Sequence, residues 1–252
     1  MKNRIFDTHT HLYFKEYEDH DIKKVTFQNG VDKVILVGCD ESSSMVASQL
    51  AIDDGFYYSV GLQPNSLDDE LNVDFIQSHI NNKKLVAIGE IGLDYYHNII
   101  EKKIQKEIFE KQLVIAIENN LPIIIHVRDA YDDVIEILKK YRSRGVIHCF
   151  NGDIKQAIEF VKLGYYLGIG GVITYKNALG LNNVVINVGI DCLVTETDCP
   201  YLAPAPHRGK TNYPHYLNHV IEHLAKIKNM DVNYVYKILY NNACKLFLGG
   251  NK

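Results

Sequence analysis

Residues 122–130 read PIIIHVRDA, a short run of mostly β-branched apolar residues that ends in a histidine and a charged segment. Such a run is typical of a strand that is buried on both faces, as strands of a parallel sheet are. Seven similar runs are spread along the chain, at residues 4–8, 33–37, 57–61, 85–89, 145–148, 165–170 and 191–195. Together these runs predict eight strands.

Stretches of helical period separate the runs. At residues 100–118 and 131–141, for example, apolar residues recur every three or four positions. Strands that alternate with helices form a parallel sheet, and eight of them in about 250 residues match a closed (β/α)8 TIM-type barrel. An open doubly wound sheet is the alternative, but no glycine-rich phosphate loop follows a strand. We predict an α/β fold with one barrel domain over residues 1–252 and an extra C-terminal helix at residues 231–248.

Composition narrows the class of protein. With 252 residues, 46% of them hydrophobic, the chain is long enough for a large buried core. Polar residues interrupt the N-terminal segment and no apolar stretch is long enough for a membrane span, so we expect no signal peptide and no membrane partner. Five cysteines without a C-x-x-C pair fit a reducing cytoplasm better than a disulfide framework. Nothing indicates an obligate protein partner.

Side chains that can bind metal follow five of the eight predicted strands, and chemistry in a barrel lies at these C-terminal strand ends. They are His9, His11, Glu90, His126, His148 and Asp198. Strand side chains alternate, so the first two histidines point the same way. Each residue alone is more often a core or capping residue, but six such groups at one rim are costly to bury without cations. We therefore predict two divalent cations and one bridging carboxylate.

Several segments of the chain resemble one known family, the TatD-type metal-dependent deoxyribonucleases of the amidohydrolase-like barrel superfamily. The segments are FDTHTH (6–11), GEIGLDYY (89–96), HVRDA (126–130), HCFNG (148–152) and ETDCPYLAPAPHRGKTNYP (196–214). The resemblance extends from about residue 4 to residue 248. It implies that one cation is held by His9, His11 and Asp198, that the other is held by His126 and His148, and that Glu90 lies between them. It also implies a DNA substrate, attacked from a 3′ end and more readily when single-stranded.

One motif departs from the pattern that is usual in this family. Where the family has His-Pro-His after the third strand, this chain has Gln63-Pro64-Asn65. The metal ligands are unaffected by this departure. We expect a changed polar contact near the substrate, and we place Gln63 among the candidates for substrate binding.

Basic and aromatic residues fall in loops that share the predicted rim. The basic candidates are Arg128, Lys176, Arg208 and Lys210, and the aromatic candidates are Tyr95, Tyr96, Tyr175 and Tyr201. The chain has a net charge of −4, so a polyanion has to be held by such a local basic patch or by cations. Guanidinium groups suit phosphates and tyrosine rings suit stacking on bases. The family resemblance favours Arg208 most, and solvated surface charge is the alternative.

Three carboxylates are expected to support the ligands. Asp7 and Glu196 share a strand face with ligand residues, so each is placed to orient a ligand imidazole from one layer below. Asp94 is a candidate for similar reasons, and loop capping or a salt bridge is an equally good interpretation of all three. Cys149 and Cys199 are next to ligands on the opposite faces of their strands, so we expect both to be buried apolar residues.

A competing motif occurs near the C-terminus. Residues 219–223 read HVIEH, the H-x-x-E-H pattern of inverted zinc proteases. Such a site needs a further carboxylate from later in the chain. The only acidic residue after His223 is Asp231, which is too near in the sequence to be that ligand. We therefore expect an exposed helix outside the barrel.

The reaction class that these residues favour is metal-assisted phosphodiester hydrolysis, with Asp198 as the general base and Glu90 as a second catalytic residue. Two alternatives stay open. One is a hydrolase of small amides, lactones or phosphoesters that uses the same site, and the other is a non-catalytic protein that binds metal or nucleic acid. Four imidazoles favour Zn²⁺ or Mn²⁺ on ligand softness, whereas the resemblance implies Mg²⁺.

Overall fold

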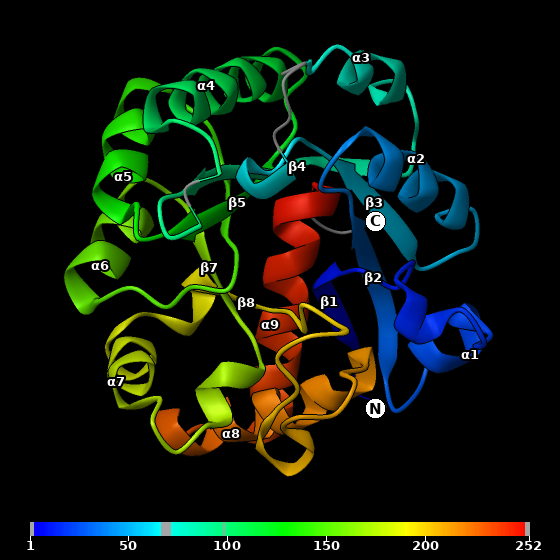
Figure 1. Cartoon of the computed structure of the whole chain (residues 1–252). Coiled ribbons are helices and arrows are strands. Elements are labelled where there is room, and N and C mark those ends of the chain that lie inside the picture. The colour runs from blue at the N-terminus through cyan, green and yellow to red at the C-terminus, as the bar shows by residue number, and fades with distance from the viewer. Residues whose placement is uncertain (1–2, 67–71, 98, 250–252) are drawn as a thin grey trace.

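The computed structural model describes residues 3–66, 72–97 and 99–249, in which eight parallel strands follow one another in the order β1 to β8. The strands are β1 (Ile5–Thr10), β2 (Val31–Val37), β3 (Phe56–Val60), β4 (Leu85–Asp94), β5 (Ile123–Arg128), β6 (Gly145–Ile147), β7 (Tyr166–Ile169) and β8 (Leu193–Thr195). An isolated bridge from Thr10 to Cys199 joins the end of β1 to the segment after β8. The nearly closed ring confirms the predicted (β/α)8 barrel (Figure 1).

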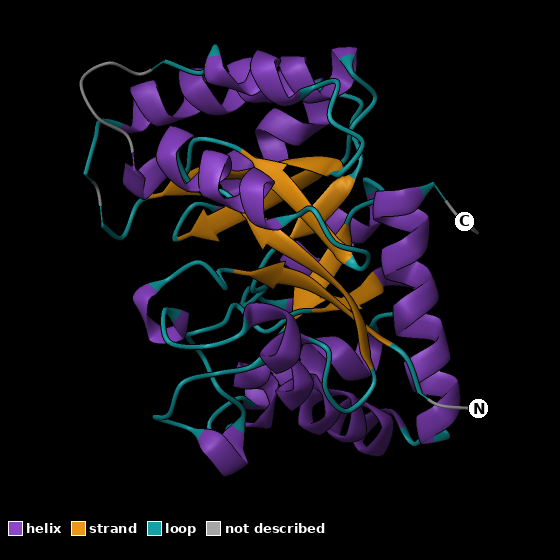
Figure 2. Cartoon of the chain, turned by 90° about the vertical axis from the view of Figure 1, so that its right-hand side faces the viewer, coloured by secondary structure: helices purple, strands orange, loops and turns teal. Residues whose placement is uncertain are grey.

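Helices surround this ring on the outside. They are α1 (Ile22–Thr26), α2 (Glu41–Leu50), α3 (Phe75–His79), α4 (Lys102–Glu118), α5 (Tyr131–Lys140), α6 (Ile154–Lys162), α7 (Leu179–Asn187) and α8 (Leu217–Lys228). The predicted extra C-terminal helix is α9 (Val232–Leu248). Figure 2 shows α9 at the end of the barrel where the strands begin, opposite the arrowheads. No helix in the described ranges is long and apolar enough to cross a membrane.

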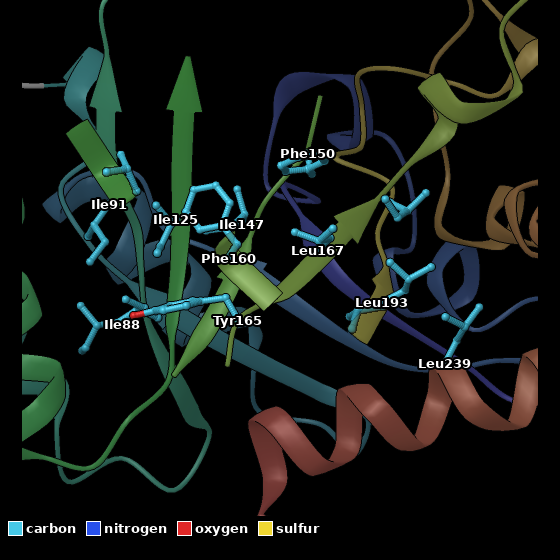
Figure 3. Close-up of a cluster of buried hydrophobic side chains, with 14 of the residues drawn as sticks. Ile88, Ile91, Ile125, Ile147, Phe150, Phe160, Tyr165, Leu167, Leu193 and Leu239 are labelled. Carbon is cyan, nitrogen blue, oxygen red and sulfur yellow. The ribbon is translucent and has the colours of Figure 1, made fainter. Parts of the chain in front are cut away.

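Apolar side chains form two layers. The outer layer lies between strands and helices, where Ile125 and Ile147 meet Phe160 of α6 (Figure 3). The second layer joins strand residues such as Phe6 and Val146 to the buried face of α9, which includes Leu246. Because α9 covers the end where the strands begin, the opposite end of the barrel is left for polar side chains.

We expect Leu167→Ala to destabilise the fold strongly. Leu167 in β7 is fully buried in the outer layer (Figure 3), so its removal leaves a cavity between strand and helices. A buried Leu→Ala change costs about 2–5 kcal/mol of unfolding free energy. The matched control is Leu179→Ala in α7, because this leucine is 74% exposed and the change should cost less than about 0.5 kcal/mol. Urea unfolding of both variants measures the difference, and equal midpoints would contradict the assigned core.

Candidate metal centre

The end of β1 and the segment after β8 carry three of the candidate ligands. His9 lies within β1 and His11 follows directly after it, and both side chains are buried. The backbone N–H of His11 donates to the carbonyl of Cys199 at 2.8 Å, and that of Asp198 donates to the carbonyl of His9 at 3.0 Å. These bonds hold the segment after β8 against β1 and so bring Asp198 next to both imidazoles.

Four ligand atoms converge at this place. The Nε2 atoms of His9 and His11 are 3.1 Å apart. Asp198 Oδ1 is 3.4 Å from His11 Nε2, and Glu90 Oε2 is 3.5 Å from His9 Nε2. Atoms that bind one ion at about 2.0–2.2 Å are about 3.0–3.5 Å from one another. The residues therefore fit a common divalent cation.

Glu90 lies inside β4, whereas the sequence predicted that the strand would end there. β4 continues to Asp94 and runs very close to β5. Gly92 has a φ of 145°, and a Cβ atom at this position would overlap the carbonyl of His126, so the close approach requires glycine. This approach brings Glu90 Oε1 to 2.8 Å from Nδ1 of His126.

The two oxygens of Glu90 face two different groups of ligands. Oε2 faces His9, as described above. Oε1 faces His126 and also lies 3.9 Å from Nε2 of His148, which is in turn 4.0 Å from Asp198 Oδ1. The second group is therefore more open than the first, and Glu90 is placed between them.

Glu196 supports His148 from the side that faces away from Glu90. Its Oε1 lies 2.9 Å from His148 Nδ1 and accepts the backbone N–H of Cys149 at 2.5 Å. The predicted contact between Glu196 and a ligand imidazole is therefore present, and such contacts fix which ring nitrogen faces an ion. Ligand atoms of His9, His148 and Glu196 also lie within 4.8 Å of one another. We assign Glu196 to holding His148 through Oε1, which the Cys149 backbone also engages, whereas its buried Oε2 has no hydrogen-bond partner among the described residues.

Asp94 supports the other imidazole of the second group. Its Oδ2 lies 3.0 Å from His126 Nε2, as expected of a residue that orients a ligand. The same oxygen accepts a hydrogen bond from Asn65 Nδ2 at 2.9 Å and lies 2.8 Å from Nδ1 of His97. Since Asp94 engages Nε2, a cation shared with Glu90 would reach His126 on its Nδ1 side.

Asp7 has a different partner from the one predicted. Its buried carboxylate accepts hydrogen bonds from the backbone N–H of Thr197 at 2.9 Å and from the Thr197 hydroxyl at 2.6 Å, instead of contacting an imidazole. Burial raises the pKa of Asp7 to about 8 and outweighs these hydrogen bonds, which lower it. Asp7 thus holds the segment that carries Asp198, which corresponds to the loop-capping alternative given for this residue and not to contact with a ligand imidazole.

The two cysteines next to ligands differ from each other. Cys199 is fully buried, as predicted, but Cys149 is only half-buried and lines a cleft, so the prediction was wrong there. Cys149 directly follows His148 after β6 and has a left-handed backbone with φ of 45°. The alternation of side chains ends where the strand ends, so it does not predict the direction of this thiol.

Sequence reasoning missed one contact of Gln63 and two residues near the centre. Gln63 was predicted to bind substrate, and in the structure its Nε2 also donates to Glu90 Oε1 at 3.2 Å, so it contacts a candidate ligand. Cys39 Sγ lies 3.8 Å from Glu90 Oε2 and follows β2, where inspection of every strand end would have found it. His97 contacts Asp94, and nothing in the sequence pointed to this residue except that it directly follows the GEIGLDYY segment.

The carboxylates and imidazoles of the centre shift one another's pKa values. Burial alone would raise the pKa of Glu90, but the neighbouring imidazoles of His148, His126 and His9 hold it well below its ordinary range. Burial alone would lower the pKa of His148, but Glu196 and Glu90 raise it to about 9. Burial and the neighbouring His148 lower the pKa of His9. A ligand must release its proton to bind a metal, so a cation would take over the balance that protons supply.

A cleft of about 380 Å³ opens beside the centre. His126, His148 and Asp198 line it together with Arg128 and Leu202. The Arg128 guanidinium lies 4.5 Å from the ring centre of Tyr96, which is exposed. A substrate that enters this cleft therefore meets both candidate ligands and a guanidinium.

The other basic and aromatic candidates at the rim differ in how exposed they are. Arg208 lies 4.3 Å from the ring centre of Tyr175, and Tyr201 is 52% exposed. Lys176 and Lys210 are also exposed. Tyr95 was a candidate for stacking, and in the structure its ring is half-buried and its hydroxyl donates to Asp133 of α5 at 2.5 Å. The sequence gave no sign of this contact with α5.

The HVIEH segment lies on α8. One face of this helix is apolar and buried, at Leu217, Val220, Ile221 and Leu224, so the helix is less exposed than expected. Its two histidines are half-buried, and Nε2 of His223 lies 3.0 Å from Asn182 Oδ1 of α7. The segment is thus part of the outer ring of helices and separate from the candidate centre.

Comparison with known proteins identifies the family. The model of the family described as TatD related DNase matches residues 6–248. A Bacillus subtilis protein named uncharacterized metal-dependent hydrolase YabD is 40% identical over 252 residues, covering 96% of this chain and 98% of that protein. An Escherichia coli K12 protein with a similar name, YcfH, is 36% identical over 77% of this chain and 74% of its own length.

Solved structures agree with this assignment. The crystal structure of YjjV, a TatD homologue from Escherichia coli K12, has a TM-score of 0.92 at 30% identity and covers 98% of this chain and 99% of that one. A TatD family hydrolase from Entamoeba histolytica shares the fold, with a TM-score of 0.84 at 22% identity over 98% of this chain and 99% of its own. The chain is therefore a metal-dependent hydrolase and belongs to the TatD-related DNase family.

Proposed function

We propose that the chain hydrolyses phosphodiester bonds of DNA at a centre that holds two divalent cations. The observation that carries this proposal is Glu90, whose two oxygens face two separate groups of ligands. His9, His11 and Asp198 are assigned to the first cation, and His126 and His148 to the second. When bound, the cations would polarise the phosphoryl group and stabilise the departing oxygen.

The residues of the chain would divide the remaining tasks. The Asp198 side chain is 17% exposed and lines the cleft, whereas that of Glu90 is 2% exposed, so Asp198 is the carboxylate that water can reach. Its carboxylate oxygen that does not hold the first cation would accept the proton of the attacking water. Glu90 would keep the two groups of ligands in register, because both of its oxygens are engaged.

The rim supports a polyanionic substrate. The chain as a whole is acidic, with a net charge of −4, yet Arg128, Arg208 and Lys210 lie at the rim. These groups would hold phosphates of the DNA backbone while the tyrosine rings beside them contact bases. We propose that the DNA strand is attacked from its 3′ end. We also propose that Mg²⁺ supports the activity and that Mn²⁺ or Zn²⁺ can replace Mg²⁺. The protein would act as a single domain in the cytoplasm.

End-labelled oligonucleotides test the proposal directly. Single- and double-stranded DNA would be incubated with the protein in Mg²⁺, Mn²⁺ or Zn²⁺, with bis(p-nitrophenyl) phosphate as the small substrate. We expect stepwise shortening of DNA from the 3′ end. Turnover of the small ester without cleavage of DNA would support the small-molecule alternative. No turnover of either substrate with metal bound would support a binding protein instead.

We expect Arg208→Ala to weaken DNA binding more than chemistry. If the guanidinium contacts one phosphate, the slope of log affinity against log salt should become shallower by about 0.7–0.9. Hydrolysis of the small ester should change much less, since that ester reaches only the metal centre. The matched control is Arg142→Ala, since Arg142 is exposed and precedes β6 at the opposite end of the barrel. Equal losses on DNA and on the ester would show a structural role for Arg208.

A further inference from the structure

Three histidines outside the candidate metal centre gather where the loop after β8 meets α8. His207 ends the short turn η5 (Ala205–His207), His215 lies in η6 (Pro214–Tyr216), and His219 lies in the first turn of α8. His215 and His219 are four residues apart on a continuous helical path, a spacing that places two side chains on one face. His207 comes to the same place from an earlier part of the loop.

The ring centres of His207 and His219 lie at a separation that two ligands of one ion can have. Their centres are 5.2 Å apart with an angle of 48° between the planes. Two imidazoles that bind one tetrahedral ion, each with a metal–nitrogen distance of about 2.0–2.1 Å, have ring centres about 5 Å apart. His9 and His11, at the candidate metal centre, are 4.9 Å apart by the same measure.

Stacking orders the His207 ring, and the surroundings lower the pKa of His207 and of His215. The His207 ring stacks on Tyr216 with centres 3.8 Å apart and planes only 2° from parallel. Burial and the neighbouring imidazoles lower the pKa of His207 and of His215, and Lys210 adds to this effect at His207. A neutral ring keeps the lone pair that a metal needs. Lys210 is the opposing feature, because its charge repels a cation.

One ring nitrogen of the cluster lacks a partner. Nδ1 of His215 is buried and has no hydrogen-bond partner among the described residues. Buried polar atoms are rarely left in this state in a folded protein. By contrast, His223, one turn further along α8, has its Nε2 engaged by Asn182 at 3.0 Å. Of these imidazoles near the start of α8, His215 therefore has a buried nitrogen left unsatisfied among the described residues.

We infer that His207 and His219 form a second, peripheral site for a transition-metal cation such as Zn²⁺ or Ni²⁺, with His215 as its neighbouring third imidazole. Imidazole nitrogen suits these cations, whereas Mg²⁺ prefers oxygen ligands. The site is therefore expected to ignore the Mg²⁺ that we propose for the catalytic centre. Its existence does not depend on the proposed nuclease activity.

The position of this site suggests a consequence for the substrate loop. Arg208 directly follows His207, and its guanidinium lies over Tyr175. An ion between His207 and His219 would tie this part of the loop to α8. If the proposed function is correct, the ion would hold the Arg208 backbone in place for contact with phosphate.

Binding of Ni²⁺ to metal-stripped protein tests the inference. Titration calorimetry and metal analysis would compare wild type with His207→Gln, His219→Gln and His223→Gln. We expect His207→Gln and His219→Gln each to weaken one Ni²⁺ site by at least about tenfold, the smallest effect usual even for residues that only support a ligand. His223→Gln should bind as wild type does. Unchanged stoichiometry and affinity in the first two variants would overturn the inference, as would a loss in His223→Gln but not in His207→Gln.

A second measurement uses the unaltered protein. Paramagnetic Ni²⁺ should broaden the imidazole proton signals of His207 and His219 in the wild-type chain while excess Mg²⁺ is present. Multidimensional NMR of isotope-labelled wild-type protein assigns the histidine signals, and circular dichroism checks that each variant of the first measurement is folded. Sharp signals from both rings, at Ni²⁺ concentrations that broaden the signals of His9 and His11, would exclude the site even if a variant failed to fold.

Discussion

Asp198→Asn is expected to lower turnover by at least about 10²–10⁴-fold at saturating metal, the range usual for loss of a general base. Asparagine has nearly the same volume and can still offer one oxygen to a cation. It lacks the charge that accepts a proton from water and that faces His11 Nε2 at 3.4 Å. The group formed by Glu90, His126 and His148 should keep its metal, and the fold should persist. Binding of DNA should change much less than the chemical step.

Single-turnover cleavage, metal content and DNA binding would be measured on the same preparation of this variant. Asp129→Asn is the matched control, since Asp129 also lines the cleft but is exposed and makes no contact with the candidate ligands among the described side chains. Asp129→Asn removes the same charge from the same cleft. A large loss of turnover in this control would therefore show that the loss in Asp198→Asn comes from the electrostatic field of the cleft. Cleavage by Asp198→Asn at the wild-type rate would remove Asp198 from the mechanism.

Removal of divalent metal is expected to abolish hydrolysis altogether. The six candidate ligands are imidazoles and carboxylates, and none of these groups supplies an electrophile that can activate a phosphodiester. A chelator should therefore reduce cleavage to background, and added Mg²⁺ or Mn²⁺ should restore it. Metal analysis before and after chelation would give the number of cations that the active protein holds, and the proposal expects two.

The fold should survive this treatment, which separates loss of chemistry from loss of structure. The apolar layers around the strands and beneath α9 do not include the candidate ligands. Circular dichroism of the metal-free protein serves as the control, with a native spectrum as the expected result. Cleavage that continues in protein shown to be free of metal would falsify the proposed mechanism.

The local pattern of apolar residues was sufficient to predict the barrel and its C-terminal helix. The β-branched runs predicted all eight strands, and the segment at residues 231–248 predicted α9. This worked because a strand covered by helices outside and apolar side chains inside must be apolar on both faces. Strand ends then located the candidate ligands, because the C-terminal ends of parallel strands meet at one rim of a barrel.

Contacts between distant segments required the tertiary structure. The extension of β4 past Glu90 depends on how closely β4 can approach β5, which Gly92 permits. The partner of Asp7 is Thr197, from the far end of the chain, and the partner of Tyr95 lies on α5. Such pairs depend on strand register and barrel closure, which the residues near each position do not encode.

The chain's own sequence thus determined the barrel and the kinds of side chain at its rim, because burial and strand alternation act on neighbours a few residues apart. Only the tertiary structure decided that Glu90 faces two ligand groups, that Gln63 holds Glu90, and that Cys149 opens onto the cleft. The physical reason is that hydrogen bonds and ion pairs act over about 3–4 Å, so sub-ångström details of strand packing select the partner.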